Sequence, residues 1–266
     1  MLEISGLTVT FAKNTVNAFR ALDDLSLTLA QGDFITVIGS NGAGKSTLIN
    51  AICGTLTPDD GRILLAGADI TYMREHQRAR SIGHLFQDPM KGTAPDMTIE
   101  ENLALAYSRS RHGGLSRAVR KRDTALFQES LRTFDLGLEN RLRTKVGMLS
   151  GGERQAMTLL MATISSPKIL LLDEHTAALD PAMAEKVLEI TRNITQMQGL
   201  TTMMITHNIH SALALGNRTI MMDAGRIVLD IQGKERSHIT VDTLLAMYRQ
   251  KSGETLATDR ILLTRR

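Results

Sequence analysis

The sequence predicts an α/β fold with a mostly parallel sheet at its core, and three observations support this prediction. Continuous apolar runs bounded by turn residues recur along the chain, as expected for parallel strands buried on both faces. Helical patterns separate these runs, so strand and helix alternate. A glycine-rich loop at residues 39–47 joins one such strand to one such helix. The 266 residues suffice for one large domain or two small ones.

The expected elements follow from these patterns in chain order. The predicted strands cover residues 2–11, 25–30, 34–39, 62–67, 82–87, 168–173, 201–206, 219–225 and 226–231. The predicted helices cover residues 45–53, 99–109, 117–135, 151–165, 181–197, 208–215 and 241–250. The first strands alternate apolar and polar residues, which favours an N-terminal antiparallel β subdomain whose strands meet at turns such as 30–33.

One stretch interrupts the alternation of strand and helix. From about residue 90 to 160 the pattern predicts helices and no strand, with a polar, glycine-containing break at 110–114. We interpret this stretch as a helical subdomain inserted into the α/β core. We expect one domain over residues 1–250 and a C-terminal tail over 251–266.

Composition narrows the classes of partner. Aromatic residues make up only 3% of the chain and tryptophan is absent, which argues against a base-stacking surface for nucleic acid. The formal net charge of +3 does not demand a polyanionic partner. Cys53 is the only cysteine, so an internal disulfide is excluded, and its apolar neighbours predict a buried thiol. No signal peptide or apolar run of about 20 residues is found, so we expect a cytosolic chain.

The glycine-rich loop matches a phosphate-binding pattern. The stretch "FITVIGSNGAGKSTLINAI" reads as strand, loop and helix, with G-x-x-x-x-G-K-[ST] at Gly39, Gly44, Lys45 and Ser46. The glycines allow the backbone to curl so that successive N–H groups point at phosphate oxygens, and the helix adds the positive end of its dipole. The pattern therefore predicts ATP or GTP binding.

Individual roles follow from this pattern. We expect Lys45 to reach the β- and γ-phosphates, Ser46 to coordinate Mg²⁺, and Thr47 to donate to the α-phosphate. The remaining loop residues would approach the phosphates mainly with their backbones, and they are Ser40, Asn41, Gly42 and Ala43.

Two carboxylates end the apolar strand of "KILLLDEH" at 168–175. An Asp in this position of a phosphate-loop protein supports Mg²⁺, usually through water, and we assign that role to Asp173. Glu174 would then face the γ-phosphate and align or deprotonate the attacking water, which predicts hydrolysis; the alternative is a plain strand-end acid. His207 follows the next apolar strand, where its ring could bind the γ-phosphate or serve a structural role.

The stretch "LSGGE" at 149–153 raises a different question. Its serine and glycines precede a helix whose first N–H groups need acceptors, which is suited to an anion. One phosphate loop already wraps the triphosphate of one ATP. The residues alone leave open whose phosphate a second anion site of this chain would bind.

Taken together, these motifs resemble those of the ATP-binding subunit of an ATP-binding cassette (ABC) transporter, from about residue 2 to 232. "GSNGAGKST" resembles the Walker A loop, "ILLLDE" resembles Walker B with its catalytic glutamate, and "LSGGE" resembles the signature motif. Gln87 in "HLFQDP" matches the Q-loop glutamine that contacts Mg²⁺ and the attacking water, and His207 matches the switch histidine. "AALD" at 177–180 resembles the D-loop.

The resemblance implies a fold, partners and further site residues. It implies a P-loop cassette over residues 1–250 that dimerises head to tail with a second copy, so that Ser150, Gly151 and Gly152 close over the partner's ATP. Phe11 lies where an aromatic residue stacks on adenine, and Phe19 competes for that role. Implied partners are integral membrane permease subunits and an extracytoplasmic substrate-binding protein, with no nucleic acid. The implied location is the cytoplasmic face of the inner membrane, peripheral through the permease.

The motifs depart from the family pattern at three positions. Glu153 replaces the usual glutamine, Ala177 the usual D-loop serine, and His175 the proline common after Walker B. A carboxylate at Glu153 is expected to repel the nucleotide if it faces it, unless pairing with Arg154 or exposure to solvent cancels most of the repulsion. The stretches 92–106 and 173–181 resemble a bacterial importer subgroup. The alternative is a soluble ABC ATPase of the iron–sulfur assembly type, while 90–148 is too short for the coiled coil of a DNA-repair ATPase.

Overall fold

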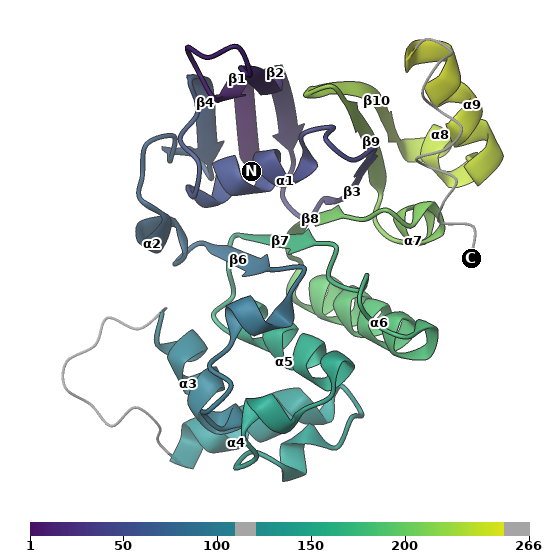
Figure 1. The fold of residues 1–266 in the computed structure, drawn as a ribbon. Helices are drawn as coiled ribbons and strands as arrows, with labels where there is room; N and C mark the ends of the chain where they lie inside the picture. Colours follow the sequence, from purple (N-terminus) through teal and green to yellow (C-terminus); the bar gives the residue numbers. More distant parts are fainter. Residues whose placement is uncertain (110–120, 253–266) are drawn as a thin grey trace. The chain divides into compact units, whose positions relative to one another are not determined.

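The computed structural model describes residues 1–109 and 121–252 and divides the chain into two compact units (Figure 1). The first unit comprises Met1–Arg78 together with the chain from Thr201 onward, and the second unit comprises Ala79–Leu200. The phosphate loop therefore belongs to the first unit, and "LSGGE" belongs to the second.

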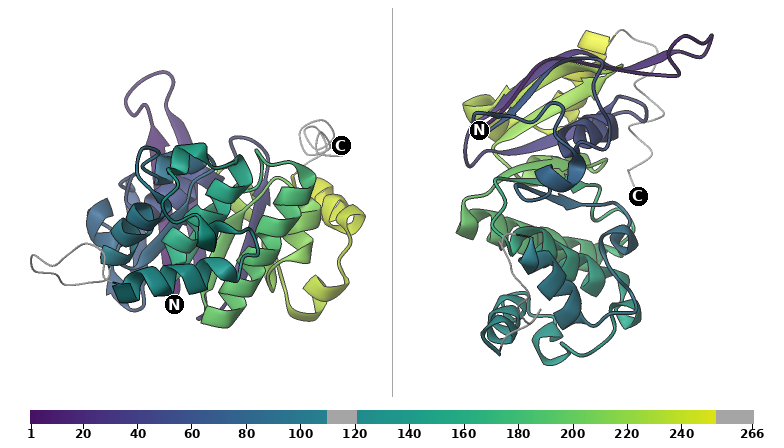
Figure 2. Two further views of the ribbon diagram at one scale, coloured as in Figure 1. Left: turned by 90° about the horizontal axis from the view of Figure 1, so that it is seen from below. Right: turned by 90° about the vertical axis from the view of Figure 1, so that its left-hand side faces the viewer.

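The first unit contains an antiparallel sheet with the strand order β2-β1-β4-β5. Its strands are β1 (Leu2–Phe11), β2 (Phe19–Leu29), β4 (Asp60–Leu65) and β5 (Ala68–Asp69). Buried and more exposed residues largely alternate along β1 and β2, so that one face of the sheet packs on the core. The loop between β1 and β2 projects from the end of this hairpin in both views of Figure 2.

A second sheet in the first unit carries the phosphate loop. β3 (Phe34–Gly39) lies between β8 (Thr201–Ile205) and β9 (Arg218–Asp223) and runs parallel to both, while β10 (Arg226–Gln232) pairs antiparallel with β9. Four of the six residues of β3 are buried, which explains its continuous apolar run.

Five helices complete the described part of the first unit. They are α1 (Lys45–Cys53), α2 (Glu75–Arg78), α7 (Ile209–Ala214), α8 (Gly233–His238) and α9 (Val241–Ser252). α7 and α9 bury Ile209 and Leu244 in one apolar cluster with Ile38 of β3 and Met221 of β9. Cys53 at the end of α1 is buried, as predicted.

The second unit is mainly helical. Two parallel strands, β6 (Ile82–Leu85) and β7 (Ile169–Asp173), accompany α3 (Ile99–Ser108), α4 (Lys121–Arg132), α5 (Gly151–Thr163) and α6 (Pro181–Gln198). Short 3₁₀ helices cover Pro89–Gly92, Leu138–Asn140 and Val146–Met148. Within 90–109 and 121–160 no strand is formed, only an isolated bridge between Thr98 and Lys145. The second unit is larger than the expected subdomain at 90–160, because it includes β6, β7 and α6.

The α/β fold with a parallel core is confirmed, and most elements lie within a few residues of their expected bounds. The prediction that the 30–33 turn joins two strands of the antiparallel sheet is wrong, because this turn joins β2 to β3 in the other sheet. Residues 12–18 connect β1 to β2. β2 begins six residues earlier than predicted, and α2, α8 and β5 were missed. Within the described residues no helix is long and apolar enough to cross a membrane. The break at 110–114, the start of the helix predicted at 117–135 and the tail from 253 lie outside the described residues.

Candidate functional site

The phosphate loop of the first unit needs glycine at two positions for steric reasons. β3 ends at Gly39 and α1 begins at Lys45. A Cβ atom on Gly39 would lie 2.3 Å from the carbonyl oxygen of Met222, and one on Gly44 would lie 2.4 Å from that of Ala21. Gly44 also has a φ of +98°, which other residues rarely adopt. The loop can therefore curl only because these two side chains are absent.

Lys45 closes the loop on itself. Its side chain is buried, and its ammonium group donates to the carbonyl oxygens of Gly39 at 2.8 Å and of Ser40 at 2.9 Å. These two hydrogen bonds fix the ammonium group of Lys45 at the loop. The N–H groups at the start of α1 lie at the same loop, because α1 begins at Lys45. The structure thus brings a fixed positive charge and a helix N-terminus to one place, which suits a phosphate.

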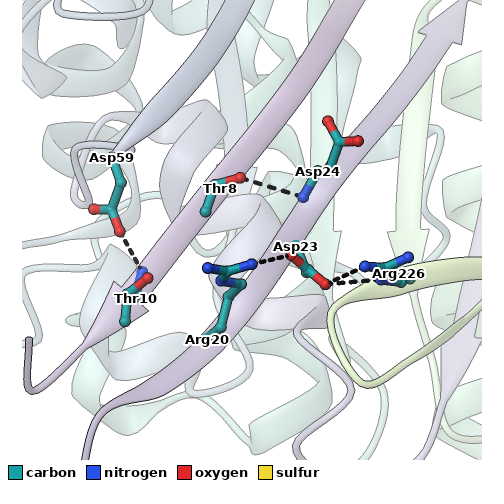
Figure 3. A network of polar contacts seen from close by, with 7 residues as sticks. All are labelled: Thr8, Thr10, Arg20, Asp23, Asp24, Asp59 and Arg226. Carbon is teal, nitrogen blue, oxygen red and sulfur yellow. Dashed lines mark hydrogen bonds and ion pairs between the residues drawn. The ribbon is translucent and has the colours of Figure 1, made fainter.

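The turn between β9 and β10 is hydrogen-bonded to the phosphate loop and to β2. The N–H of Gly225 donates to the carbonyl oxygen of Ala43 at 3.1 Å, and the carbonyl oxygen of Gly225 accepts from the N–H of Asp23 at 3.1 Å. The Asp23 carboxylate lies between Arg20 and Arg226 (Figure 3), at 2.7 Å from Arg20 and 2.5 Å from Arg226. Hydrogen bonds from Arg20 and then from Arg226 lower the pKa of Asp23. This ion-pair network ties β2 to the turn, and sequence reasoning missed it.

Phe11 and Phe19 occupy the end of the β1–β2 hairpin. Phe11 is the last residue of β1 and Phe19 the first of β2, and they are direct partners across the ladder. Their exposed fractions are 42% and 52%. Thr10, the residue before Phe11, is held by a 2.8 Å hydrogen bond from its N–H to Asp59 (Figure 3). The fold thus brings the two competing aromatic residues together.

His207 shares an edge of the sheet with the phosphate loop. β8 is parallel to β3, with Ile205 opposite Val37, so the carboxyl ends of both strands point the same way. Gly39 is the last residue of β3 and leads into the phosphate loop. Thr206 and His207 follow the end of β8, and the N–H of Thr206 donates to the carbonyl oxygen of Val37 in β3 at 3.2 Å. His207 therefore follows the carboxyl end of a strand that is parallel to β3, as expected of a residue that comes after the apolar run at 201–206.

In the second unit, the strand ends bring Gln87 and Glu174 together. β6 and β7 are parallel, with Leu85 opposite Leu172. Gln87 lies two residues after the end of β6, and Glu174 directly follows β7. The amide Nε2 of Gln87 donates to Oε2 of Glu174 at 3.2 Å. Glu174 has a φ of +48°, a left-handed conformation that is uncommon for a residue with a side chain. Backbone strain of this kind is concentrated at functional sites.

His175 is anchored in the interior of the second unit. Its side chain is 3% exposed, and Nε2 lies 3.2 Å from the hydroxyl oxygen of Thr191 in α6. That hydroxyl donates its single proton to the carbonyl oxygen of Val187 at 2.8 Å, so it must accept from His175. The ring is therefore the tautomer with a proton on Nε2. Burial lowers the pKa of His175 to about 4, so the ring is neutral at pH 7.

Ser150 and Glu153 form a reciprocal cap at the start of α5. The Ser150 hydroxyl accepts from the N–H of Glu153 at 3.2 Å, and the Glu153 carboxylate accepts from the N–H of Ser150 at 2.9 Å. The other oxygen of Glu153 lies 2.5 Å from the guanidinium of Arg141. The charge of Glu153 is thus paired within its own chain, by a residue that the motif analysis did not consider.

Two other residues shape the neighbourhood of this cap. Gly152 is buried, and a Cβ atom there would lie 1.9 Å from Cγ of Met183 in the first turn of α6. Arg154 donates to the carbonyl oxygens of Val146, Gly147 and Leu149 in the preceding loop at 3.0–3.3 Å. Gly151 and Ala177 are exposed. Gly152 of the signature stretch is therefore packed against α6, while Ser150 and Gly151 are exposed.

The candidate Mg²⁺ ligands are divided between the units. Ser46 lies in the first unit, whereas Gln87 and Asp173 lie in the second. In the part of the chain that the structure describes, no group of three His, Cys, Asp or Glu residues is arranged as a metal site. Mg²⁺ in proteins is usually held by one or two side chains together with the phosphates of a substrate.

Comparison with known proteins identifies the class of this chain. The model of the ABC transporter family matches residues 22–177, more than half of the chain, and the chain belongs to that family. It is 40% identical over 248 residues to a tyrosine transport ATP-binding protein of Clostridioides difficile (strain R20291), covering 93% of this chain and 98% of that protein. A methionine import ATP-binding protein MetN of Rhizobium johnstonii is 36% identical over 83% of this chain, which spans only 59% of that relative.

Solved structures agree with this assignment. A dimeric ATP-binding cassette in a post-hydrolysis state with ADP and Pi has a TM-score of 0.75 and 26% identity, covering 87% of this chain and 98% of that one. An ATP-binding cassette of an ABC transporter has a TM-score of 0.76 at 26% identity, covering 93% and 98%. The chain is therefore an ABC ATPase, and it is an ATP-binding subunit of a transporter. The names of these relatives do not favour the soluble iron–sulfur assembly alternative.

Proposed function

We propose that this chain powers a bacterial importer, and that two copies close head to tail around ATP to move a membrane permease. The tyrosine transport relative overlaps this chain over nearly the full length of both, and the methionine relative is an import subunit. These names favour an amino acid as the transported substrate. The subunit would bind the cytoplasmic side of its permease, and an extracytoplasmic binding protein would deliver the substrate.

The first unit would hold the nucleotide. The curled loop offers N–H groups to the β- and γ-phosphates, Lys45 supplies the charge, and Thr47 donates to the α-phosphate. The exposed rings of Phe11 and Phe19 offer a surface for adenine. The Ser46 hydroxyl would contribute an oxygen to Mg²⁺, together with Asp173 through water and the amide oxygen of Gln87. These are hard oxygen donors, which fit Mg²⁺ and not a softer metal.

The second unit would activate water. Glu174 would accept a proton from the attacking water or orient it, and Gln87 holds one carboxylate oxygen in place at 3.2 Å. His207 of the first unit would donate to the γ-phosphate from the edge that also carries the loop. Bound Mg²⁺ would neutralise charge on the phosphates, and the protein residues would supply the alignment.

The signature turn would serve the second copy. Ser150 is exposed at the N-terminus of α5, with the N–H groups of Gly151 and Gly152 beside it. Together they would bind the γ-phosphate held by the partner's loop. The observation that carries the proposal is the exposed Ser150 and Gly151 at the N-terminus of α5, in a chain whose phosphate loop leads into a different helix, α1.

The proposal is tested with Glu174→Gln, which keeps the shape of the side chain and removes the base. We expect ATP hydrolysis to fall by about a hundredfold or more, while ATP with Mg²⁺ converts the variant to a dimer on gel filtration. Glu185→Gln, an exposed carboxylate on α6, is the matched control and should behave like the parent. A variant that keeps most of the parent rate would show that another residue orients the water.

Import is tested in cells. A strain lacking this chain should lose uptake of its amino acid, and the parent sequence should restore it while Glu174→Gln does not. Uptake of labelled tyrosine and methionine would be compared first, because two relatives carry those names. Unchanged uptake with increased retention of a labelled compound would instead indicate export.

A further inference from the structure

The cap at the start of α5 contains one residue pair that the family motif does not explain. Both oxygens of Glu153 are engaged, one by the N–H of Ser150 at 2.9 Å and the other by Arg141 at 2.5 Å. The Glu153 side chain is 19% exposed. Burial alone would raise the pKa of Glu153, but the hydrogen bond from Ser150 and the ion pair with Arg141 outweigh it and lower the pKa. The carboxylate is therefore ionised and directed at its own chain.

Arg141 is held in position by its backbone. Its N–H donates to the carbonyl oxygen of Leu138 at 3.0 Å, and its carbonyl oxygen accepts from the N–H of Thr144 at 2.8 Å. The neighbouring side chains of Leu138 and Leu142 are buried, and the carbonyl oxygen of Leu142 accepts from the first turn of α3 at Glu100. The backbone position of Arg141 is therefore fixed, and the ion pair costs only the rotamer freedom of the side chains.

Charge at this turn matters because the turn is an anion site in the proposed function. A lone carboxylate three residues after Ser150 would repel a phosphate, whereas the glutamine usual in the family is neutral. Arg141 restores neutrality and also holds Glu153 where it can accept from the N–H of Ser150. Glu153 can therefore cap the helix, as the pattern S-x-x-E predicts, while Arg141 neutralises the charge that would otherwise repel a phosphate.

We propose that Arg141 and Glu153 together replace the neutral glutamine of the signature motif, and that Arg141 is a positioning residue for the turn that binds the partner's ATP. This inference rests on the proposed function, because it assumes that Ser150 meets a phosphate of the second copy. Arg141 acts through Glu153 and Ser150 and does not touch the nucleotide.

The test is a double-mutant cycle in the Glu174→Gln background, with the ATP-dependent dimer dissociation constant as readout. Arg141→Gln leaves the carboxylate unpaired, so we expect the dimer to weaken by about tenfold. Glu153→Gln combined with Arg141→Gln removes both charges and should recover to within about threefold of the parent. Arg141→Lys keeps the charge and should also stay near the parent. Arg143→Gln, an exposed cation two residues away, is the control and should change nothing.

Two further readouts separate positioning from a purely structural role. Affinity of the monomer for ATP should not change in Arg141→Gln, because the loop of the first unit is intact. The dimer constant of Arg141→Gln should respond differently to added salt than that of the double variant, since only the former carries the unpaired charge. A purely structural role would lower the melting temperature of the double variant at least as much as that of either single variant, with no recovery of dimerisation.

The outcomes distinguish a failure of the proposed ATP-driven dimerisation from a failure of the proposed role of Arg141 and Glu153. If ATP does not dimerise the Glu174→Gln parent, the proposed function fails, whatever Arg141 does. If the parent dimerises but Arg141→Gln dimerises equally well, or the double variant dimerises worse than Arg141→Gln, only the role of the pair is overturned. Should Arg141→Gln not fold, Arg141→Met takes its place in the cycle, because it also removes the charge and keeps a long side chain.

Discussion

His175 makes the stability of this protein depend on pH in a way that can be isolated. The residue directly follows Glu174, is almost fully buried, and donates from Nε2 to Thr191. Burial lowers the pKa of its ring from an ordinary value of 6.5 to about 4. In the unfolded chain the ring is solvated and regains its ordinary pKa. Below pH 6.5 the unfolded state therefore takes up a proton that the folded state does not bind.

The sign and size of the effect follow from these two values. Because the folded pKa lies below the unfolded one, stability falls as the pH drops through 6.5 and levels off below about pH 4. Between pH 7 and pH 5 the free energy of unfolding falls by about 2 kcal/mol, because it decreases by up to 1.36 kcal/mol for each pH unit between the unfolded and the folded pKa. That is a large share of a marginal folding free energy.

The test uses the variant His175→Gln, because the glutamine amide nitrogen can replace Nε2 as the donor to Thr191 but does not titrate. Urea unfolding of parent and variant at pH 7 and pH 5 gives the free energy of unfolding at each pH. We expect the parent to lose about 2 kcal/mol more than the variant over this interval. His84, whose pKa burial also lowers to about 4, is present in both proteins and cancels in the comparison. Equal losses in the two proteins would show that the pKa of His175 does not differ between the folded and unfolded states.

Further predictions concern the nucleotide site and the signature turn. Lys45→Ala removes a charge-assisted contact worth about 1.5–3 kcal/mol, so ATP affinity by calorimetry should fall; an unchanged affinity would reject the loop assignment. Phe11→Ala should weaken ATP binding by about 1 kcal/mol and Phe19→Ala by less, as measured by titration with a fluorescent ATP analogue; the reverse order would assign the adenine to Phe19. Gly152→Ala should lower stability by about 1–3 kcal/mol because its Cβ meets Met183, and the thermal melt should recover when Met183→Ala is added. Absence of recovery would point to another cause.

Local patterns predicted the elements that are determined locally. The strand, loop and helix around Lys45 were expected at 34–39 and 45–53 and are found there, because the apolar run and the glycines act on adjacent residues. The start of β2 was missed because it depends on pairing with β1. The register between these strands shifts three times, which interrupts the alternation that marks a strand in the sequence.

Pairing also limits what the sequence could say about the site. The contact between Gln87 and Glu174 depends on the pairing of β6 with β7, which joins residues 87 positions apart, and the sequence analysis predicted a role for each residue but not their contact. The choice between Phe11 and Phe19 depends on the hairpin register, which places them opposite each other and leaves both rings exposed. The support of the phosphate loop by Gly225 joins segments about 180 residues apart and has no local signal.

The departures from the family pattern show why a motif read one position at a time can mislead. Glu153 taken alone predicts repulsion of the nucleotide, and His175 taken alone suggests a lost proline. In the structure each has a partner outside its motif: Arg141 lies 12 residues before Glu153, and Thr191 lies 16 residues after His175. The S-x-x-E pattern of Ser150 and Glu153 could have indicated the cap, but no local pattern indicates the cation that neutralises it. If neutrality of the turn is what matters, relatives with glutamine at the position of Glu153 have no need of a cation at the position of Arg141. An arginine retained there regardless of the residue at position 153 would mean that Arg141 serves a purpose other than charge compensation.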